Sequence, residues 1–210
     1  TGSTDKTMEI AKKFTDKVYN FLWRNDFSAA RNESLKYATA DWLLILDADE
    51  IIAEEDSQKI LEAVNNWDIT GFRILTKNYN NDSSISGWQP CNKDDQFSKS
   101  FQGWVPSLKV RLFQRHEQIK FTGKMHEMVD QSIEACKEKI GILRIPVHHY
   151  GVIKNPDEKI KQYLNLTKEK IAENPRDAKA YFELGVQYKG LKQLIPAEEA
   201  FKQSLHLDSN

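Results

Sequence analysis

The feature that most constrains the fold of this chain is an unbroken apolar run, Trp42 to Leu46, which leads directly into Asp47-Ala48-Asp49-Glu50. A run without polar alternation is typical of a strand buried on both faces, as in a parallel sheet covered by helices. The run is also far shorter than the roughly 20 apolar residues that cross a bilayer. It therefore predicts a core strand of a globular domain, with a cluster of carboxylates at its end.

The carboxylates after this strand indicate a binding site. Residues i and i+2 of an extended chain point to the same side, so Asp47 and Asp49 can converge. Ligands of open α/β sheets bind beyond the carboxyl ends of the strands, where this pair lies. Oxygen ligands favour Mg²⁺ or Mn²⁺, which commonly bridge protein carboxylates to substrate phosphates. We predict a metal or nucleotide site here; the alternative is a solvated acidic turn.

Helical and strand-like segments alternate along the first 75 residues, which is the pattern of an α/β fold with a mostly parallel sheet. Apolar residues at helical spacing predict three helices, and shorter apolar runs predict further strands. The predicted helices cover residues 5–14, 27–38 and 60–67, and the predicted strands cover Val18 to Leu22, Trp42 to Leu46 and Phe72 to Leu75.

A long segment, Lys77 to Ser107, has little periodicity and many Asn, Asp and Ser residues. A loop of this length is uncommon unless it forms a lid or a binding element. Its residues Trp88 and Trp104 would either stack on a sugar or an acceptor, or anchor the loop to the domain. Strands are predicted again at 110–113, 119–121 and 142–147.

The chain is helical from Asn155-Pro156 onward, and this segment resembles a tetratricopeptide repeat. Small residues let two helices approach closely, and aromatic residues fill the space around them. The matching positions are Tyr181, Leu184, Gly185, Tyr188, Ala197 and Phe201. We therefore predict an α/β domain over residues 1–155 and a helical segment over 156–210. A generic helical hairpin is the alternative reading of this segment.

Composition excludes several classes of protein. Thirty basic and thirty-one acidic side chains leave a net charge of -1, which gives no reason to expect nucleic acid or an anionic membrane as the main partner. The two cysteines, Cys91 and Cys136, are too few for a disulfide scaffold, although they could pair with each other. We expect a cytoplasmic protein without a transmembrane segment; a peripheral position at a membrane surface is the alternative.

Several motifs together resemble glycosyltransferase family 2, and more narrowly its bacterial branch with tetratricopeptide repeats after the catalytic domain. The resemblance covers essentially the whole chain in order. Its segments are Thr1 to Asp5, Asn25 to Asn32, Trp42 to Glu50, Arg111 to Phe113, Phe121 to Glu127 and His148 to Gly151. It implies a GT-A fold, which is a nucleotide-sugar-binding α/β sandwich with an Asp-x-Asp motif and a divalent cation, Mn²⁺ or Mg²⁺.

The resemblance also implies roles for matching residues. Asp49 would ligate the metal, and Asp47 would contact the ribose or reach the metal through water. His149 would complete the metal coordination, and Arg31 would contact the nucleotide.

Two further residues, Ser3 and Asp5, would belong to the turn beside the base. Helix capping or a surface charge is the alternative for Arg31, Ser3 and Asp5. The first strand of the family and its Asp before Thr-Gly-Ser do not occur in this sequence. We therefore expect an N-terminally incomplete domain.

The pair His126-Glu127 is the candidate for acid–base chemistry. In an inverting transferase a carboxylate takes the proton of the acceptor, and this base needs hydrogen-bond reach of the acceptor. We predict Glu127 as the base, with His126 orienting it or binding phosphate. Both could instead be structural partners in a loop, and the rival bases are Asp94, Asp95 and Glu50.

Arg111 lies among apolar neighbours in a predicted strand. It would either meet the diphosphate of a nucleotide sugar or the acceptor, or form a buried ion pair within the protein.

The leading hypothesis is a metal-dependent, inverting glycosyltransferase that moves a sugar from a nucleotide-diphosphate sugar to a hydroxyl or thiol of a saccharide, lipid or peptide. The alternative is an incomplete, non-catalytic module that binds a protein partner or a twin subunit through its helices. A third hypothesis is a metal hydrolase built from the acidic pair with His126, His148 and His149.

Overall fold

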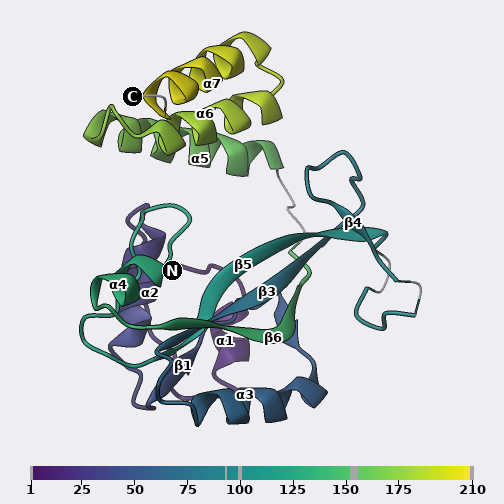
Figure 1. The fold of residues 1–210 in the computed structure, drawn as a ribbon, viewed down its shortest axis with the longest axis vertical. Coiled ribbons are helices and arrows are strands. Elements are labelled where there is room, and N and C mark those ends of the chain that lie inside the picture. The colour runs from purple at the N-terminus through teal and green to yellow at the C-terminus, as the bar shows by residue number, and fades with distance from the viewer. Residues whose placement is uncertain (1, 93, 99–100, 152–155, 209–210) are drawn as a thin grey trace. The chain divides into compact units, whose positions relative to one another are not determined.

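The computed structural model describes residues 2–92, 94–98, 101–151 and 156–208. The chain forms two compact units, Thr1–Gly151 and Val152–Asn210. The first unit contains the strands, and the second is made of helices (Figure 1). The predicted boundary at Asn155-Pro156 touches residues 152–155, which lie outside the described ranges. Among the helices described, none has the length and apolar character needed to cross a bilayer.

The described strands of the first unit form one sheet in the order β1-β5-β3-β6-β2, with β4 paired to β5. These strands are β1 (Trp42–Leu44), β2 (Glu50–Ile52), β3 (Gly71–Asn80), β4 (Gln89–Pro90), β5 (Gly103–Gln114) and β6 (Ile140–His149). Strands β3 and β6 run parallel, and the other described pairings are antiparallel. The α/β class is as predicted, but the sheet is mixed rather than mostly parallel, because β5 returns antiparallel beside β3.

The run Trp42 to Leu46 is not a strand buried on both faces. Its regular part, β1, stands at the end of the described strand order and pairs antiparallel with β5 alone. Leu44 and Leu46 are more than a third exposed. The apolar run therefore predicted the strand correctly but not its place in the sheet.

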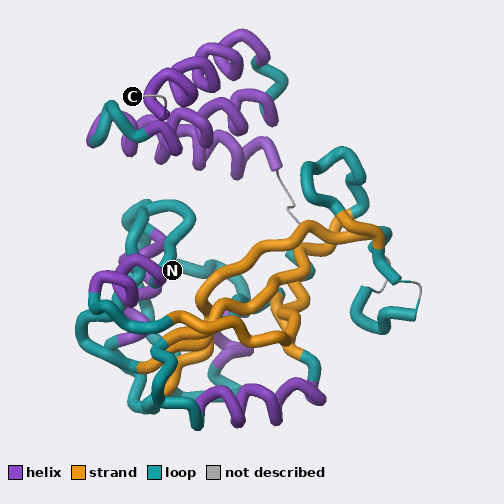
Figure 2. Tube along the Cα trace, in the orientation of Figure 1, coloured by secondary structure: helices purple, strands orange, loops and turns teal. Residues whose placement is uncertain are grey.

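The predicted loop between Lys77 and Ser107 begins and ends inside a hairpin arm, visible as the long paired strands of Figure 2, whereas the described residues between Asn80 and Gly103 are irregular apart from β4. Strands β3 and β5 pair from Gly71–Phe113 out to Asn80–Gly103. The Trp88 ring lies over Gly103, where an added Cβ would come within 2.1 Å of it. Trp88 therefore anchors the tip of the arm, which was one of its two predicted roles.

Helices cover both faces of the sheet (Figure 1). On one face α3 (Ser57–Val64) packs its apolar side over Phe72, Ile74 and Val147. On the other face Val129, the residue before α4 (Asp130–Ala135), and Ile133 within it pack with Phe113 and Phe121. The helical elements of this unit are α1 (Thr7–Ala11), α2 (Phe27–Leu35), the short 3₁₀ helix η1 (Glu54–Asp56), α3 (Ser57–Val64) and α4 (Asp130–Ala135).

Two predicted strands are absent from the described sheet. Residues Val18 to Leu22 form an irregular segment, and Leu22 is 78% exposed. Ile119 and Phe121 are buried, but the segment is a loop and not the predicted strand: the backbone N–H and C=O of Phe121 pair with the side-chain amide of Asn32 at 2.8 and 2.9 Å. A side chain thus provides the hydrogen bonds that a strand partner would otherwise supply.

The second unit contains α5 (Pro156–Glu173), α6 (Ala178–Gly190) and α7 (Leu194–Asp208). Asp177 caps α6 by accepting a hydrogen bond from the N–H of Ala180 at 2.9 Å. A Cβ at Gly185 would lie 2.5 Å from the Phe201 ring. The small residue lets α6 and α7 approach closely, as the repeat pattern predicted.

Candidate functional site

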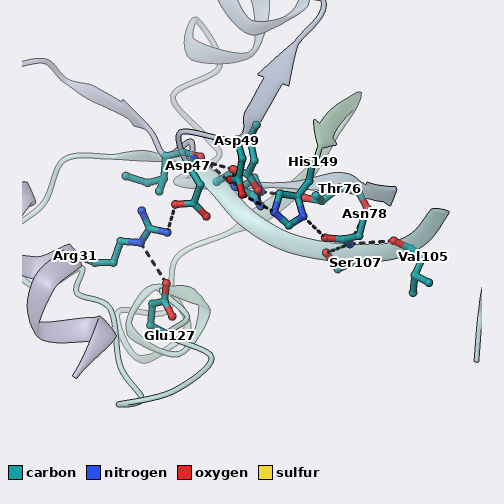
Figure 3. Close-up of polar contacts among 12 residues, drawn as sticks. Arg31, Asp47, Asp49, Thr76, Asn78, Val105, Ser107, Glu127 and His149 are labelled. Atoms are coloured by element: carbon teal, nitrogen blue, oxygen red, sulfur yellow. Dashed lines mark hydrogen bonds and ion pairs between the residues drawn. The ribbon is translucent and has the colours of Figure 1, made fainter. Parts of the chain in front are cut away.

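The site is built on α2, whose start is fixed by a cap. Asp26 accepts a hydrogen bond from the N–H of Ala29 at 2.9 Å, which satisfies one of the free donors at the helix N-terminus. Asn32 in the following turn joins the helix to the loop at Phe121. The neighbouring residue, Arg31, is thereby held beside the loop that carries Glu127 (Figure 3).

Arg31 links Asp47, a predicted nucleotide or metal ligand, to Glu127, the predicted base. Its Nη2 donates to Oδ1 of Asp47 at 2.5 Å, and its Nε donates to Oε1 of Glu127 at 3.2 Å. Burial on its own would lower the pKa of Arg31, but the hydrogen bond to Asp47 and the charges of Asp47 and Glu127 raise it above its ordinary value. Arg31 is therefore a permanent cation between two carboxylates.

The turn after β1 is held by a buried ion pair. Arg111 donates from Nη2 and Nη1 to the two carboxylate oxygens of Glu50, at 2.6 and 2.7 Å. Oε2 of Glu50 also accepts from the N–H of Asp47 at 2.8 Å. The side chains of Arg111 and Glu50 are 8% and 2% exposed. The structure thus bears out the buried ion pair left open for Arg111 and occupies Glu50, a rival base, with a structural role.

A second polar group forms around Asp49. Its Oδ2 lies 3.4 Å from Nε2 of His149, and its backbone C=O accepts from the N–H of Tyr150 at 3.0 Å. The Nδ1 of His149 lies 2.9 Å from Oδ1 of Asn78. Figure 3 shows Asp49 and His149 pointing toward each other from the turn after β1 and from the end of β6.

The two aspartates take different partners. Asp47 pairs with Arg31, whereas Asp49 faces His149. Within the residues that the structure describes, no three His, Cys, Asp or Glu side chains form a ready metal cage. Asp49 and His149 offer one oxygen and one nitrogen ligand, and a Cβ at Gly151 would lie 2.5 Å from Nε2 of His149 and 3.0 Å from Oδ2 of Asp49. The glycine keeps the space beside both atoms clear, which fits a cation completed by substrate phosphates.

A groove runs beside the Arg31 contacts. Its charged lining includes Arg31, Asp47, Lys109 and Glu127. Positively and negatively charged side chains therefore border one concave surface.

The sequence pattern described as "Glycosyl transferase family 2" matches residues 1–130, which is more than half of the chain and includes all of α2, β1 and the turn with Asp47 and Asp49. The chain belongs to glycosyl transferase family 2.

Relatives of this family 2 chain align with nearly all of its sequence. A TPR repeat-containing protein of Synechococcus elongatus is 28% identical over 217 residues, covering 98% of this chain and 48% of the relative. The SPbeta prophage-derived glycosyltransferase SunS of Bacillus subtilis is 28% identical over 211 residues, covering 97% and 45%. The chain therefore spans about half the length of these relatives.

Two crystal structures of S. aureus TarS 1–349 also align with the chain. The first covers 99% of this chain and 71% of TarS at 15% identity, with a TM-score of 0.41. The second, a complex with UDP-GlcNAc, covers 99% and 72% at 15% identity, with a TM-score of 0.44. At this level of likeness TarS adds nothing to the assignment.

The residues that the family resemblance placed near the nucleotide differ in their surroundings. Oδ1 of Asp5 accepts from the N–H of Thr7, the first residue of α1, at 3.0 Å, but Asp5 lies before the N-cap position, Lys6, which makes no side-chain capping bond. Ser3 is exposed in the same turn. The roles of Ser3 and Asp5 in nucleotide binding stay predictions, as does the contact of Arg111 with a nucleotide sugar.

Loop 122–128 brings Glu127 to Arg31. The backbones of Thr122 and Met128 exchange two hydrogen bonds at 2.9 and 3.0 Å, which close the loop. His126 has a φ of 55°, a left-handed conformation uncommon for residues other than glycine. A strained residue directly before Glu127 is typical of functional loops. The role of His126 toward phosphate stays a prediction.

Histidines 148 and 149 point to opposite faces of β6, because side chains alternate along a strand. His148 is 2% exposed, and its Nδ1 lies 2.7 Å from the hydroxyl of Tyr79. His148 therefore packs with Tyr79 and Phe97 and does not point to the site of His149. The hydrolase hypothesis thereby loses one of its proposed metal ligands.

Sequence reasoning missed Asn78, which contacts His149. The available signal was the polar alternation Thr76, Asn78, Asn80 within β3.

Proposed function

We propose that this chain carries the donor site of a glycosyltransferase that moves a sugar from a nucleotide-diphosphate sugar to an acceptor hydroxyl or thiol with inversion. Family membership supports glycosyl transfer in general. The observation that carries the finer proposal is the bridge of Arg31 between Asp47 and Glu127, beside the facing pair Asp49 and His149.

Glu127 is proposed as the base. Arg31 contacts its Oε1, so Oε2 is the oxygen that takes the acceptor proton. The acceptor oxygen or sulfur then forms a bond to the anomeric carbon, and the bond from that carbon to the diphosphate oxygen breaks with its electron pair on the diphosphate. A carboxylate oxygen that Arg31 leaves unoccupied, on a side chain held in place by that contact, suits this step.

Asp49 and His149 are proposed to hold a divalent cation, Mn²⁺ or Mg²⁺. A cation there would neutralise charge on the leaving diphosphate. Arg31 contributes a second positive charge on the other side of Asp47, where it can meet the nucleotide once Asp47 contacts the ribose.

The experiment for the base is the release of nucleoside diphosphate from a panel of nucleotide-diphosphate sugars, with and without thiol and hydroxyl acceptors. Glu127→Gln keeps the size of the side chain but cannot take the proton. We expect a loss of about 10²- to 10⁴-fold in acceptor-dependent release. The matched control is Asp94→Asn, which removes a rival base. It should change acceptor-dependent release of nucleoside diphosphate by less than about twofold. An active Glu127→Gln protein would contradict the assignment.

The role of the helical unit as a protein-interaction or dimerisation module stays a second proposal. It is supported by Phe182 and Val186, which lie one turn apart on α6 and are about half exposed. Sedimentation of the wild-type protein and of a Phe182→Ser/Val186→Ser variant tests the twin-subunit form. A monomer at all concentrations would contradict it.

A further inference from the structure

The side chain of Asn78 has one possible orientation. Its Nδ2 lies 2.9 Å from the C=O of Val105 on β5 and 3.2 Å from Oγ of Ser107. A backbone carbonyl can only accept, so the NH₂ end of the amide must face it. The carbonyl end, Oδ1, therefore faces His149.

This orientation fixes the hydrogen of the imidazole. Oδ1 of Asn78 has no hydrogen to donate and lies 2.9 Å from Nδ1 of His149. Nδ1 must carry the proton. In the neutral ring Nε2 then presents its lone pair, and it does so toward Oδ2 of Asp49 at 3.4 Å.

Two electron-rich atoms that face each other at this distance repel unless a cation or a proton lies between them. The space beside them is kept open by Gly151, where any Cβ would come within 3.0 Å of both atoms. The arrangement is a pair of ligands oriented in advance.

We infer that Asn78 is a positioning residue that holds His149 with Nδ1 protonated and Nε2 aimed at Asp49, so that the two side chains bind a divalent cation of the Mn²⁺ or Mg²⁺ class. The inference rests on the proposed donor site. Asn78 can do this because β3 lies between β5 and β6, with Val105 and His149 as its partners in register on the two sides. The arm of β3 and β5 thus holds the ring of a residue on β6.

The test measures Mn²⁺ affinity and the ring tautomer on the same proteins. Free Mn²⁺ is counted by electron paramagnetic resonance for wild type, Asn78→Leu and the matched control Asn80→Leu, a residue two positions along the same strand. Loss of such an outer partner typically weakens metal affinity about 10- to 100-fold. We expect a loss of Mn²⁺ affinity of this size in Asn78→Leu. In Asn80→Leu the Mn²⁺ affinity should change by less than about twofold.

The tautomer is read from imidazole ¹⁵N spectra of the metal-free proteins at pH 8, above the ordinary imidazole pKa of about 6.5. The signal of His149 among the five histidines is assigned with His149→Gln. We expect the Nδ1–H form in wild type and in Asn80→Leu, and a mixture of tautomers in Asn78→Leu. Circular dichroism checks that each variant is folded.

The outcomes separate the two proposals. Wild-type protein that binds no Mn²⁺ contradicts the donor site itself. A His149 spectrum that is the same in Asn78→Leu and wild type overturns the positioning role of Asn78, whatever the Mn²⁺ result. Equal Mn²⁺ affinities of folded Asn78→Leu and wild type also overturn it.

Discussion

Nη2 of Arg31 lies 2.5 Å from Oδ1 of Asp47, which joins the second turn of α2 to the residue at the end of the apolar run. The same guanidinium reaches Glu127 through a different nitrogen, Nε. Arg31 thus contacts both Asp47, the predicted nucleotide ligand, and Glu127, the predicted base.

Replacing Arg31 by lysine should impair the site without unfolding the protein. An ammonium is a compact point charge and cannot aim separate donors at Asp47 and Glu127. We expect nucleoside diphosphate release to fall at least about tenfold, as for an electrostatic group lost from a transition state. The control is Lys36→Met, which removes an exposed cation from the end of the same helix. Equal activity of Arg31→Lys and wild type would show that the bridge is not needed.

The ion pair of Arg111 and Glu50 should be structural. Arg111→Met leaves the buried Glu50 carboxylate without its partner, and loss of one partner typically costs about 3–5 kcal/mol of unfolding free energy. All five tryptophans lie in the first unit, so urea titration followed by tryptophan fluorescence reports on that unit. The double variant Arg111→Met/Glu50→Leu should recover much of the loss, because no charge stays buried. A single variant as stable as wild type would contradict this role.

His148 should make the first unit less stable in mild acid. Burial lowers the pKa of His148, and the charge of Lys77 lowers it further, while Asp95, Asp56 and Glu55 act in the opposite direction. An unfolded histidine has a pKa of about 6.5. As the pH falls through that value the unfolded chain takes up the proton first, so the unfolding free energy falls.

The measurement is the urea midpoint between pH 7.5 and 5. The contribution of His148 cannot exceed about 1.4 kcal/mol per pH unit. His148→Phe should remove it, since a ring without titratable nitrogen can keep the stacking with Phe97. His116→Gln, at an exposed histidine of the same unit, should keep the wild-type pH dependence. An unchanged slope in His148→Phe would assign the effect to other groups.

Gly151→Ala should close the space beside His149. The new Cβ would lie 2.5 Å from Nε2 of His149, so the ring must shift. We expect weaker Mn²⁺ binding, by about 10-fold or more, as for other disturbances of ligand orientation. In a His149→Ala background the same glycine change should have a smaller effect, because only the 3.0 Å approach of the new Cβ to Oδ2 of Asp49 remains. Additive losses in the double variant would contradict the direct contact.

The sequence predicted this site in part. The motifs singled out Asp47, Asp49, Glu127 and His149 as site residues. The apolar spacing also predicted the helix that carries Arg31. The partners were not, because they come from residues far apart: Glu50 and Arg111 are separated by 61 positions. A buried ion pair and a ligand-binding arginine look alike in a single strand sequence.

The fold was predicted least well where pairing decides the structure. Val18 to Leu22 has the apolar residues of a strand but no strand partner within the described sheet. The polar residues of β3 looked like a loop, since nothing local shows that Asn78 has Val105 on one side and His149 on the other. Strand register is a non-local property, and patterns within one segment do not encode it.

We propose that the Arg31 bridge and the Asp49–His149 pair together form a donor site that needs a divalent cation. Its most direct test is calorimetric titration of UDP, GDP, ADP and CDP into wild-type protein, with and without Mn²⁺, and into Asp49→Asn. We predict that at least one nucleoside diphosphate binds in the presence of Mn²⁺, binds far more weakly without it, and loses the Mn²⁺ dependence in Asp49→Asn. Absence of binding by all four with Mn²⁺ present, or equal binding by Asp49→Asn, would contradict it.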